Sequence, residues 1–177
     1  MDIVAELIGC IAIIASVLIY QQKNEKGILL NKGLTDALWI THYIMIGGYT
    51  GAAISGLGMI RGIVLSINAR RGIKSKRVLL LFLLVSLLCT AITWQGMFSI
   101  FPAVASLLAV ISFWIGNPKI LRIMSFPISA CMMTYGVYNG SAAAVINEVL
   151  VMASSLIGIL KYDRRRKQPL FSGRGTE

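Results

Sequence analysis

The apolar residues of the chain fall into seven continuous runs, which cover about residues 3–20, 28–46, 52–68, 78–93, 98–115, 120–138 and 142–161. Each run is roughly 16–20 residues long, and a helix that rises about 1.5 Å per residue needs about this length to cross a hydrocarbon core of about 30 Å. The runs are continuous rather than alternating, which argues against membrane β-strands. The pattern predicts an all-α membrane protein with seven transmembrane helices.

Most charged residues lie between these runs. Only 14% of the residues are charged, whereas soluble proteins have about a quarter, and 56% are hydrophobic. The net charge is +10, but all of the 17 Lys and Arg residues except Arg61 fall beside the ends of the runs or in the C-terminal tail. This placement favours orientation in a membrane over nucleic-acid binding. We therefore expect the lipid bilayer as a partner and no nucleic acid.

The loops between the runs alternate in charge. The first, third and fifth loops and the C-terminal tail carry Lys and Arg residues, whereas the second, fourth and sixth loops carry none. Basic loops stay on the cytoplasmic side under the positive-inside rule. The alternation predicts a multi-pass protein with its N-terminus outside and its C-terminus in the cytoplasm.

Two of the uncharged turns resemble each other. One reads Gly47-Gly-Tyr-Thr-Gly51 and the other Gly136-Val-Tyr-Asn-Gly140, so one constant offset pairs Gly47 with Gly136 and Gly51 with Gly140. The offset predicts a three-helix repeat that is present twice in the same orientation. The expected organisation is a first repeat at 1–70, a basic inner loop and a lipid-facing linker helix at 71–96, a second repeat at 97–163 and a basic cytoplasmic tail at 164–177. Parallel repeats of this kind place a site between the two halves, near mid-membrane.

Two charged residues lie in the middle of apolar runs. At about 1.5 Å per residue, Arg61 is about 18 Å and Glu148 about 15 Å from the outer turn of its repeat. Ionisable groups at such a depth usually face a bundle interior or a wet cavity. Three interpretations are open for Arg61: a structural ion pair with Glu148, an anion-binding group in a central cavity, or a side chain that extends toward the membrane interface.

Asp36, Trp39 and His42 follow one another at three-residue intervals in the second run, so we expect them to share one helix face. They form either a polar, aromatic cavity wall, with His42 or Asp36 as a proton relay, or a set of structural contacts. In the second case His42 hydrogen-bonds a neighbouring helix and Asp36 pairs with lysines at the inner end. The candidate substrate-binding or cavity residues are Asp36, Trp39, His42, Arg61, Asn147 and Glu148.

The sequence lacks the patterns that are typical of enzymes and metal sites. It contains one histidine, three cysteines in separate apolar runs, and no nucleophile elbow or phosphate loop. We therefore expect no catalytic residue, no metal and no cofactor. Besides lipid, a small solute and a second copy of the chain are the partners that the sequence leaves open.

The chain resembles the YgjV-type bacterial inner-membrane proteins. The residues that carry this resemblance are Gly48-Tyr-Thr-Gly-Ala-Ala-Ile through Met59-Ile-Arg61, His42, and the Tyr138-Asn-Gly-Ser turn before Asn147 and Glu148. The resemblance implies an integral protein of the bacterial inner membrane.

The three-plus-one-plus-three plan is also similar to that of the SWEET sugar transporters and the wider MtN3/PQ-loop group. Trp39 and Asn147 resemble the tryptophan and asparagine that line the SWEET sugar pocket. The Pro-Gln pair of that group is missing, because the chain reads Tyr20-Gln21-Gln22 at the matching position. The likeness implies a fold of two parallel three-helix bundles joined by a linker helix.

Two functions remain open at this point. The first is transport of a small solute through a mid-membrane site between pseudo-symmetric halves. The second is a structural or regulatory role without transport, in which Arg61 and Glu148 form a buried ion pair. A polar central pocket would favour transport, whereas a direct contact between the two charges would favour the structural role.

Overall fold

The computed structural model of the chain describes residues 3–19, 25–70, 75–115 and 117–163. Within these residues lie seven α-helices, α1 (Ile3–Ile19), α2 (Glu25–Met45), α3 (Tyr49–Arg70), α4 (Lys76–Ile92), α5 (Ile100–Ile115), α6 (Pro118–Tyr138) and α7 (Ala142–Gly158). A 3-10 turn (Met97–Ser99) precedes α5, and a π-helical turn (Ile159–Asp163) follows α7. The prediction of an all-α protein with seven helices is confirmed.

Three of the helices begin at a residue whose side chain caps the first turn. Ser75, Asn117 and Ser141 each accept a hydrogen bond from a backbone amide at the start of α4, α6 and α7, respectively. Such caps satisfy amide groups that have no partner within the helix. They explain why α4 and α6 begin before the apolar runs that predicted them.

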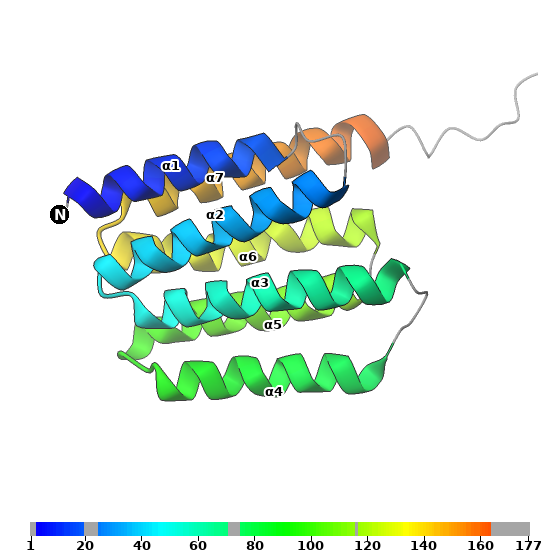
Figure 1. Cartoon of the computed structure of the whole chain (residues 1–177), viewed down its shortest axis with the longest axis horizontal. Coiled ribbons are helices and arrows are strands. Elements are labelled where there is room, and N and C mark those ends of the chain that lie inside the picture. Colours follow the sequence, from blue (N-terminus) through cyan, green and yellow to red (C-terminus); the bar gives the residue numbers. More distant parts are fainter. Residues whose placement is uncertain (1–2, 20–24, 71–74, 116, 164–177) are drawn as a thin grey trace, which may run out of the picture.

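The helices form two rows that face each other (Figure 1). Helices α1, α2 and α3 lie side by side, with α7, α6 and α5 behind them, and consecutive helices in each row are in contact. Contacts between α1 and α7 and between α3 and α5 close the two rows into a ring. Helix α4 packs from outside against α3 and α5.

One face of α4 is buried against the ring, whereas its interpretation as a lipid-facing linker had predicted no buried face. Phe82, Ser86 and Thr90 are buried, while the opposite side exposes Leu80, Leu81, Leu84, Leu87 and Leu88. The buried residues are four positions apart and therefore form one stripe along the helix. The run as a whole is so apolar that Ser86 and Thr90 give no sign in the sequence that they mark a buried stripe.

The turns at Gly47 and Gly140 share one backbone geometry, although the sequence paired Gly47 with Gly136. Gly47 and Gly140 have φ angles of 75° and 68°. The amides of the next residues, Gly48 and Ser141, donate to carbonyls five residues earlier, at 2.7 and 2.9 Å. This pattern closes a helix C-terminus with a glycine in the left-handed region. The equivalent residues are therefore Gly47 and Gly140.

Gly136, which the sequence paired with Gly47, has a different role. It lies inside α6, where an added Cβ would be 2.9 Å from Ala144 Cβ of α7. The glycine therefore allows two helices to approach closely. Glycines that serve packing and glycines that serve turns look the same in a sequence, so the pairing of Gly47 with Gly136 does not match the pairing by turn geometry.

The N-termini of α3 and α7 are each held by a side chain from another part of the chain. The amide of Tyr49 donates to Gln95 Oε1 at 2.9 Å, and Gln95 Nε2 donates to the carbonyl of Gly47 at 2.7 Å. The amide of Ala143 donates to Glu6 Oε2 at 2.9 Å. These bonds attach α3 to the segment before α5, and α7 to α1.

Three segments of the described chain are both long and apolar enough to cross a bilayer by length and composition. They are Met97–Ile115, Lys119–Tyr138 and Ala142–Lys161, and Ile3–Ser16 is a shorter apolar helix. Helix α4 has 17 residues and begins with Lys76 and Arg77, while α2 includes Glu25, Lys26, Lys32 and Asp36. The count of seven membrane spans stays a prediction.

Two buried tyrosines fill the ring near the turns at Gly47 and Gly140. Tyr43 of α2 and Tyr135 of α6 have ring centroids 6.0 Å apart, and the amide of Gly51 donates to the Tyr135 hydroxyl at 3.3 Å. A Cβ on Gly51 would lie 2.8 Å from Tyr135 Cε1 and 3.0 Å from Tyr43 Cδ1. These rings are fixed by burial, so they cannot give way cheaply.

We expect Gly51→Ala to lower the free energy of unfolding by about 1–3 kcal/mol, because the added methyl group overpacks this contact. The control is Gly56→Ala in the same helix, where a Cβ would meet Ile40 Cδ1 at 3.6 Å. Alanine should leave stability there unchanged, or raise it by up to about 1 kcal/mol through helix propensity. Thermal unfolding of the purified protein in detergent compares the two variants. Equal melting temperatures would contradict this account of the tyrosine packing.

Candidate functional site

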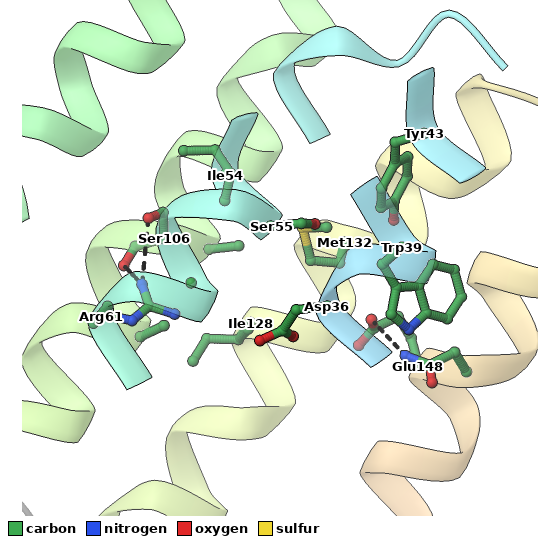
Figure 2. A pocket seen from close by; sticks show the side chains of 14 residues that line it. Asp36, Trp39, Tyr43, Ile54, Ser55, Arg61, Ser106, Ile128, Met132 and Glu148 are labelled. Atoms are coloured by element: carbon green, nitrogen blue, oxygen red, sulfur yellow. Dashed lines mark hydrogen bonds between the residues drawn. The ribbon is translucent and has the colours of Figure 1, made fainter. Parts of the chain in front are cut away.

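A cavity of about 190 Å³ lies within the ring of helices (Figure 2). Its lining comes from α2, α3, α5, α6 and α7. The charged and polar lining residues are Asp36, Tyr43, Ser55, Arg61, Ser106, Asn147 and Glu148, and Trp39 adds an indole ring. Five of the six residues proposed from the sequence thus line one cavity: Asp36, Trp39, Arg61, Asn147 and Glu148.

Arg61 is buried, with 8% of its surface exposed. Its Nη1 donates to the carbonyl and to the hydroxyl of Ser106 on α5, at 3.4 and 3.5 Å, and Nε has no hydrogen-bond partner in the described part of the chain. These bonds are long for a charged donor, which normally reaches about 2.7–2.9 Å. The guanidinium therefore keeps donor capacity for a further acceptor in the cavity.

A chain of hydroxyl groups determines how Ser106 meets Arg61. Ser86 Oγ of α4 donates to the carbonyl of Phe82 at 2.7 Å and lies 3.0 Å from Ser106 Oγ. The single hydroxyl proton of Ser86 is used in the first bond, so Ser106 donates its own proton to Ser86. The lone pairs of Ser106 Oγ then remain for Arg61. The outer helix α4 thereby helps to orient the arginine.

The two acidic residues of the cavity lie at different positions relative to Arg61. In Figure 2, Arg61 and Ser106 lie toward one end of the cavity, Trp39 and Glu148 lie toward the other, and Asp36 lies between them. The charge of Asp36 acts on Arg61. Glu148 Oε1 accepts a hydrogen bond from Asn147 Nδ2 at 3.2 Å.

The direct Arg61–Glu148 ion pair, one of the three interpretations of Arg61, is not formed within the described part of the chain. The hydrogen bonds of Arg61 go to Ser106, and that of Glu148 goes to Asn147. The low exposure of Arg61 also argues against a side chain that extends to the membrane interface. The geometry leaves Arg61 as a cation that faces an internal polar cavity.

His42 does not line the cavity, although Asp36 and Trp39 on the same helix do. Successive residues of an α-helix are rotated by about 100°. His42, six residues after Asp36, therefore points about 120° away from it, whereas Tyr43, seven residues after Asp36, returns to within about 20°. Each step of three residues falls about 60° short of a full turn, and the two steps from Asp36 to His42 add up. The three residues therefore do not share one face. Tyr43 takes the place in the cavity wall that was expected for His42.

His42 instead joins α2 to two other helices. It is fully buried, its Nδ1 lies 2.7 Å from the carbonyl of Ala5 on α1, and its Nε2 lies 2.7 Å from Ser141 Oγ at the start of α7. A carbonyl can only accept, so Nδ1 carries a proton, and in the neutral ring Nε2 accepts from the Ser141 hydroxyl. The His42 ring also meets Trp39 edge-on, at a centroid distance of 5.4 Å. This geometry supports the structural interpretation of His42.

Other lining residues were not among the candidates from the sequence. Ser55 and Ser106 are single hydroxyl groups in apolar helices, and such residues are too common in membrane helices to stand out. Gly58 also lines the cavity beside Arg61, and a Cβ there would make an ordinary van der Waals contact with Arg61 Nη2, at 3.5 Å. Its position three residues before Arg61 was the one sign in the sequence that Gly58 could lie at the site.

A family of bacterial inner membrane proteins matches almost the whole chain. The matched region is residues 3–166, and the family is described as Imp-YgjV, bacterial inner membrane protein. The chain belongs to the Imp-YgjV family. This confirms the YgjV-type resemblance, and the inner membrane is the location that family membership supports. The comparisons bring no match to the SWEET or PQ-loop group, and neither the curated proteins nor the solved structures contain a match.

The Imp-YgjV description names a location and no chemistry, so the site itself must suggest the function. Among the described residues there is no group of three His, Cys, Asp or Glu side chains that could hold a metal ion. The groups that the cavity offers a ligand are one guanidinium, two carboxylates, hydroxyl and amide groups, and aromatic rings. Such groups bind a polar solute through charge and hydrogen bonds.

Proposed function

We propose that this Imp-YgjV protein is a transporter of small polar solutes rather than an enzyme, with the central cavity as its solute site. The observation that carries the proposal is the set of three charges around a cavity inside the ring, with Asp36 on α2, Arg61 on α3 and Glu148 on α7. Ionisable groups are costly inside a membrane, and they are typical of solute and ion pathways. A cavity below the usual 300–1,000 Å³ of drug-sized ligands suits a small solute.

We further propose that α1–α3 and α5–α7 are the two halves that move around this site, with α4 as the linker. Three observations support this plan. The contacts α1–α2–α3 are repeated as α5–α6–α7, and the contact of α3 with α5 corresponds to that of α7 with α1. The turns at Gly47 and Gly140 have the same geometry. The N-terminus of α3 is capped by Gln95, which lies just before the second half, and the N-terminus of α7 is capped by Glu6 of α1 in the first half.

In the proposed N-outside orientation, the outer-turn end of the cavity faces away from the cytoplasm. Tyr43 lines the cavity and packs on Tyr135, and both rings are almost completely buried. Gly48 and Gly51 bring the start of α3 against these rings. Rocking of the halves would separate the two tyrosines and open this end, as alternating access between repeats requires.

The test of the proposed function is a solute screen followed by transport. The purified full chain is heated with panels of amines, amino acids, carboxylates, sugars and alcohols, because a ligand that binds the native state raises the melting temperature. Compounds that stabilise the protein are then followed as labelled solutes into proteoliposomes. Uptake above that of empty liposomes is expected for at least one class. Binding without uptake by any compound would instead favour a non-transporting, regulatory role.

A variant that fills the cavity separates specific uptake from leakage. Ser55→Trp places an indole in the cavity and should lower solute uptake at least tenfold, on the order of 1.4 kcal/mol or more of lost binding. The control is Ile63→Trp, because Ile63 is an exposed residue of the same helix and an aromatic ring on the outer surface leaves the cavity open. Initial uptake rates are measured for both variants in proteoliposomes of equal protein content. Full uptake by Ser55→Trp would exclude this cavity as the pathway.

A further inference from the structure

The cavity is lined by more acidic than basic side chains. This difference indicates the charge of a solute that would fit it. Among the lining side chains, Arg61 is the cation, and Asp36 and Glu148 are the acids. When all three are ionised, the lining carries one more negative than positive charge. A carboxylate in a low-dielectric interior is costly, and a solute cation beside Glu148 would offset its charge.

The two ends of the cavity differ in the partner they offer. Asp36 lies between Arg61 and Glu148 and acts electrostatically on Arg61, so Glu148 is the acid farther from the guanidinium (Figure 2). Trp39 lies toward the same end as Glu148, and Asn147 hydrogen-bonds the carboxylate. A carboxylate and an indole ring toward one end of a cavity are a favourable environment for an ammonium group, which gains both a charged hydrogen bond and a cation–π contact.

The opposite end offers a donor instead. The guanidinium of Arg61 lines the cavity, and its Nη1 bonds to Ser106, at 3.4 and 3.5 Å, are long for a charged donor. A charged donor without a short hydrogen bond lacks part of the compensation for its burial. An oxygen of the solute, in a hydroxyl, carbonyl or carboxylate group, would satisfy it.

We propose that the solute of this cavity is a small primary amine with an acceptor oxygen at its other end, the ammonium group lying at Glu148 and Trp39 and the oxygen at Arg61. This inference rests on the proposed function for its location and adds the substrate class. Amino alcohols and amino acids are the compounds that carry both groups. A carboxylate without an amine lacks the group for Glu148, and an amine without oxygen leaves Arg61 unsatisfied.

Four linear compounds of equal chain length test the proposal on the full chain: aminobutanol, aminobutyrate, butylamine and butyrate. Binding is measured by thermal shift and by isothermal titration in detergent. Aminobutanol or aminobutyrate is expected to bind at least about tenfold more tightly than butylamine, because its oxygen adds a hydrogen bond to a charged group. Butyrate is expected to bind most weakly.

Two variants test which end of the cavity binds the ammonium group and which end binds the oxygen. Glu148→Gln keeps the shape of the side chain and removes its charge, so it should weaken all three amines by about tenfold to hundredfold. Arg61→Gln should weaken aminobutanol and aminobutyrate in the same range and leave butylamine within about twofold. If either variant is poorly folded, as judged by its melting temperature and by size-exclusion chromatography, the four wild-type affinities still decide the question.

Several outcomes would overturn the substrate class. Butyrate or glucose binding more tightly than every amine would do so, and so would the absence of binding by all four compounds. The proposed function is judged separately, by uptake of any compound and its loss in Ser55→Trp. Uptake of glucose or butyrate through the cavity would thus contradict the amine substrate class and still support the transport function. Amine binding without any uptake would keep the amine site and reject transport.

Discussion

Arg61→Gln is expected to lower the affinity for aminobutanol and its rate of uptake by about 100-fold, while the protein remains folded. Removing one partner of a buried, hydrogen-bonded charged contact costs about 2–5 kcal/mol in binding, or a factor of about 30 to several thousand. Glutamine can still donate a hydrogen bond, so the loss measures the positive charge and the geometry of the guanidinium donors. Initial uptake rates in proteoliposomes and affinities from isothermal titration give the two quantities.

The stability of the same variant separates a binding role from a structural one. Glutamine leaves the charge of Asp36 with less compensation, and we expect the free energy of unfolding to fall by about 1–3 kcal/mol. Arg77→Gln is the matched control, because Arg77 lies exposed in the first turn of α4 and should change neither uptake nor stability. If Arg61→Gln lost stability but kept normal affinity and uptake, Arg61 would be structural, and the interpretation of the cavity as a solute site would fail.

Arg61→Lys tests what the shape of the guanidinium contributes. Lysine keeps the charge, but it presents a compact ammonium group in place of the planar set of donors. Its uptake should therefore fall between those of wild type and Arg61→Gln. Equal uptake by Arg61→Lys and wild type would mean that the charge alone matters, and that no particular donor faces the solute.

The number, class and approximate limits of the helices could be predicted from the sequence, because continuous apolar runs separated by glycine-rich or basic turns have few other solutions. The buried polar set was also largely predictable. Asp36, Arg61 and Glu148 are ionisable groups in apolar runs, and such groups rarely face lipid. Depth along each helix follows from residue counting, so the prediction that Arg61 and Glu148 lie at similar depths needed no structure.

Direction around the helix axis was harder to predict than depth. Arg61 and Glu148 were expected at similar depth, but their depths contain no information on whether they point at each other or at different walls of a cavity. The structure turns Arg61 toward Ser106 on α5 and leaves Asp36 between the two charges. Accumulated rotation likewise moved His42 away from Asp36. Errors of this kind grow with each residue that separates two positions on one helix.

Partners on distant helices were not predictable from one sequence. The bonds of His42 to Ala5 and Ser141 depend on α1 and α7 being neighbours, which is a property of the closed ring. The same is true of Ser106, whose role as acceptor for Arg61 depends on α4 supplying Ser86. Small hydroxyl residues give no periodic or charge signal, so these contacts became visible with the fold.

His42→Ala is expected to lower the free energy of unfolding by about 3 kcal/mol. The substitution removes a fully buried ring that makes 2.7 Å contacts with both α1 and α7. Truncation of a buried ring leaves a cavity, which typically costs about 3–5 kcal/mol for aromatic residues, and loss of the Ser141 contact adds a hydrogen-bond term of about 1 kcal/mol or less in a membrane setting. Relaxation of α1 against α2 offsets part of this. Unfolding in mixed detergent micelles, followed by circular dichroism, measures the change.

The neighbour Thr41 supplies the control, because it lies exposed on α2 and bonds within its own helix, to the carbonyl of Ala37. Thr41→Ala should change stability by less than about 0.5 kcal/mol. The proton-relay interpretation predicts the reverse for His42→Ala, namely lost uptake with unchanged stability, because a relay acts on the solute pathway and not on packing. Loss of stability together with uptake that recovers once equal amounts of folded protein are compared would show that His42 holds the ring of helices together and takes no part in moving the solute.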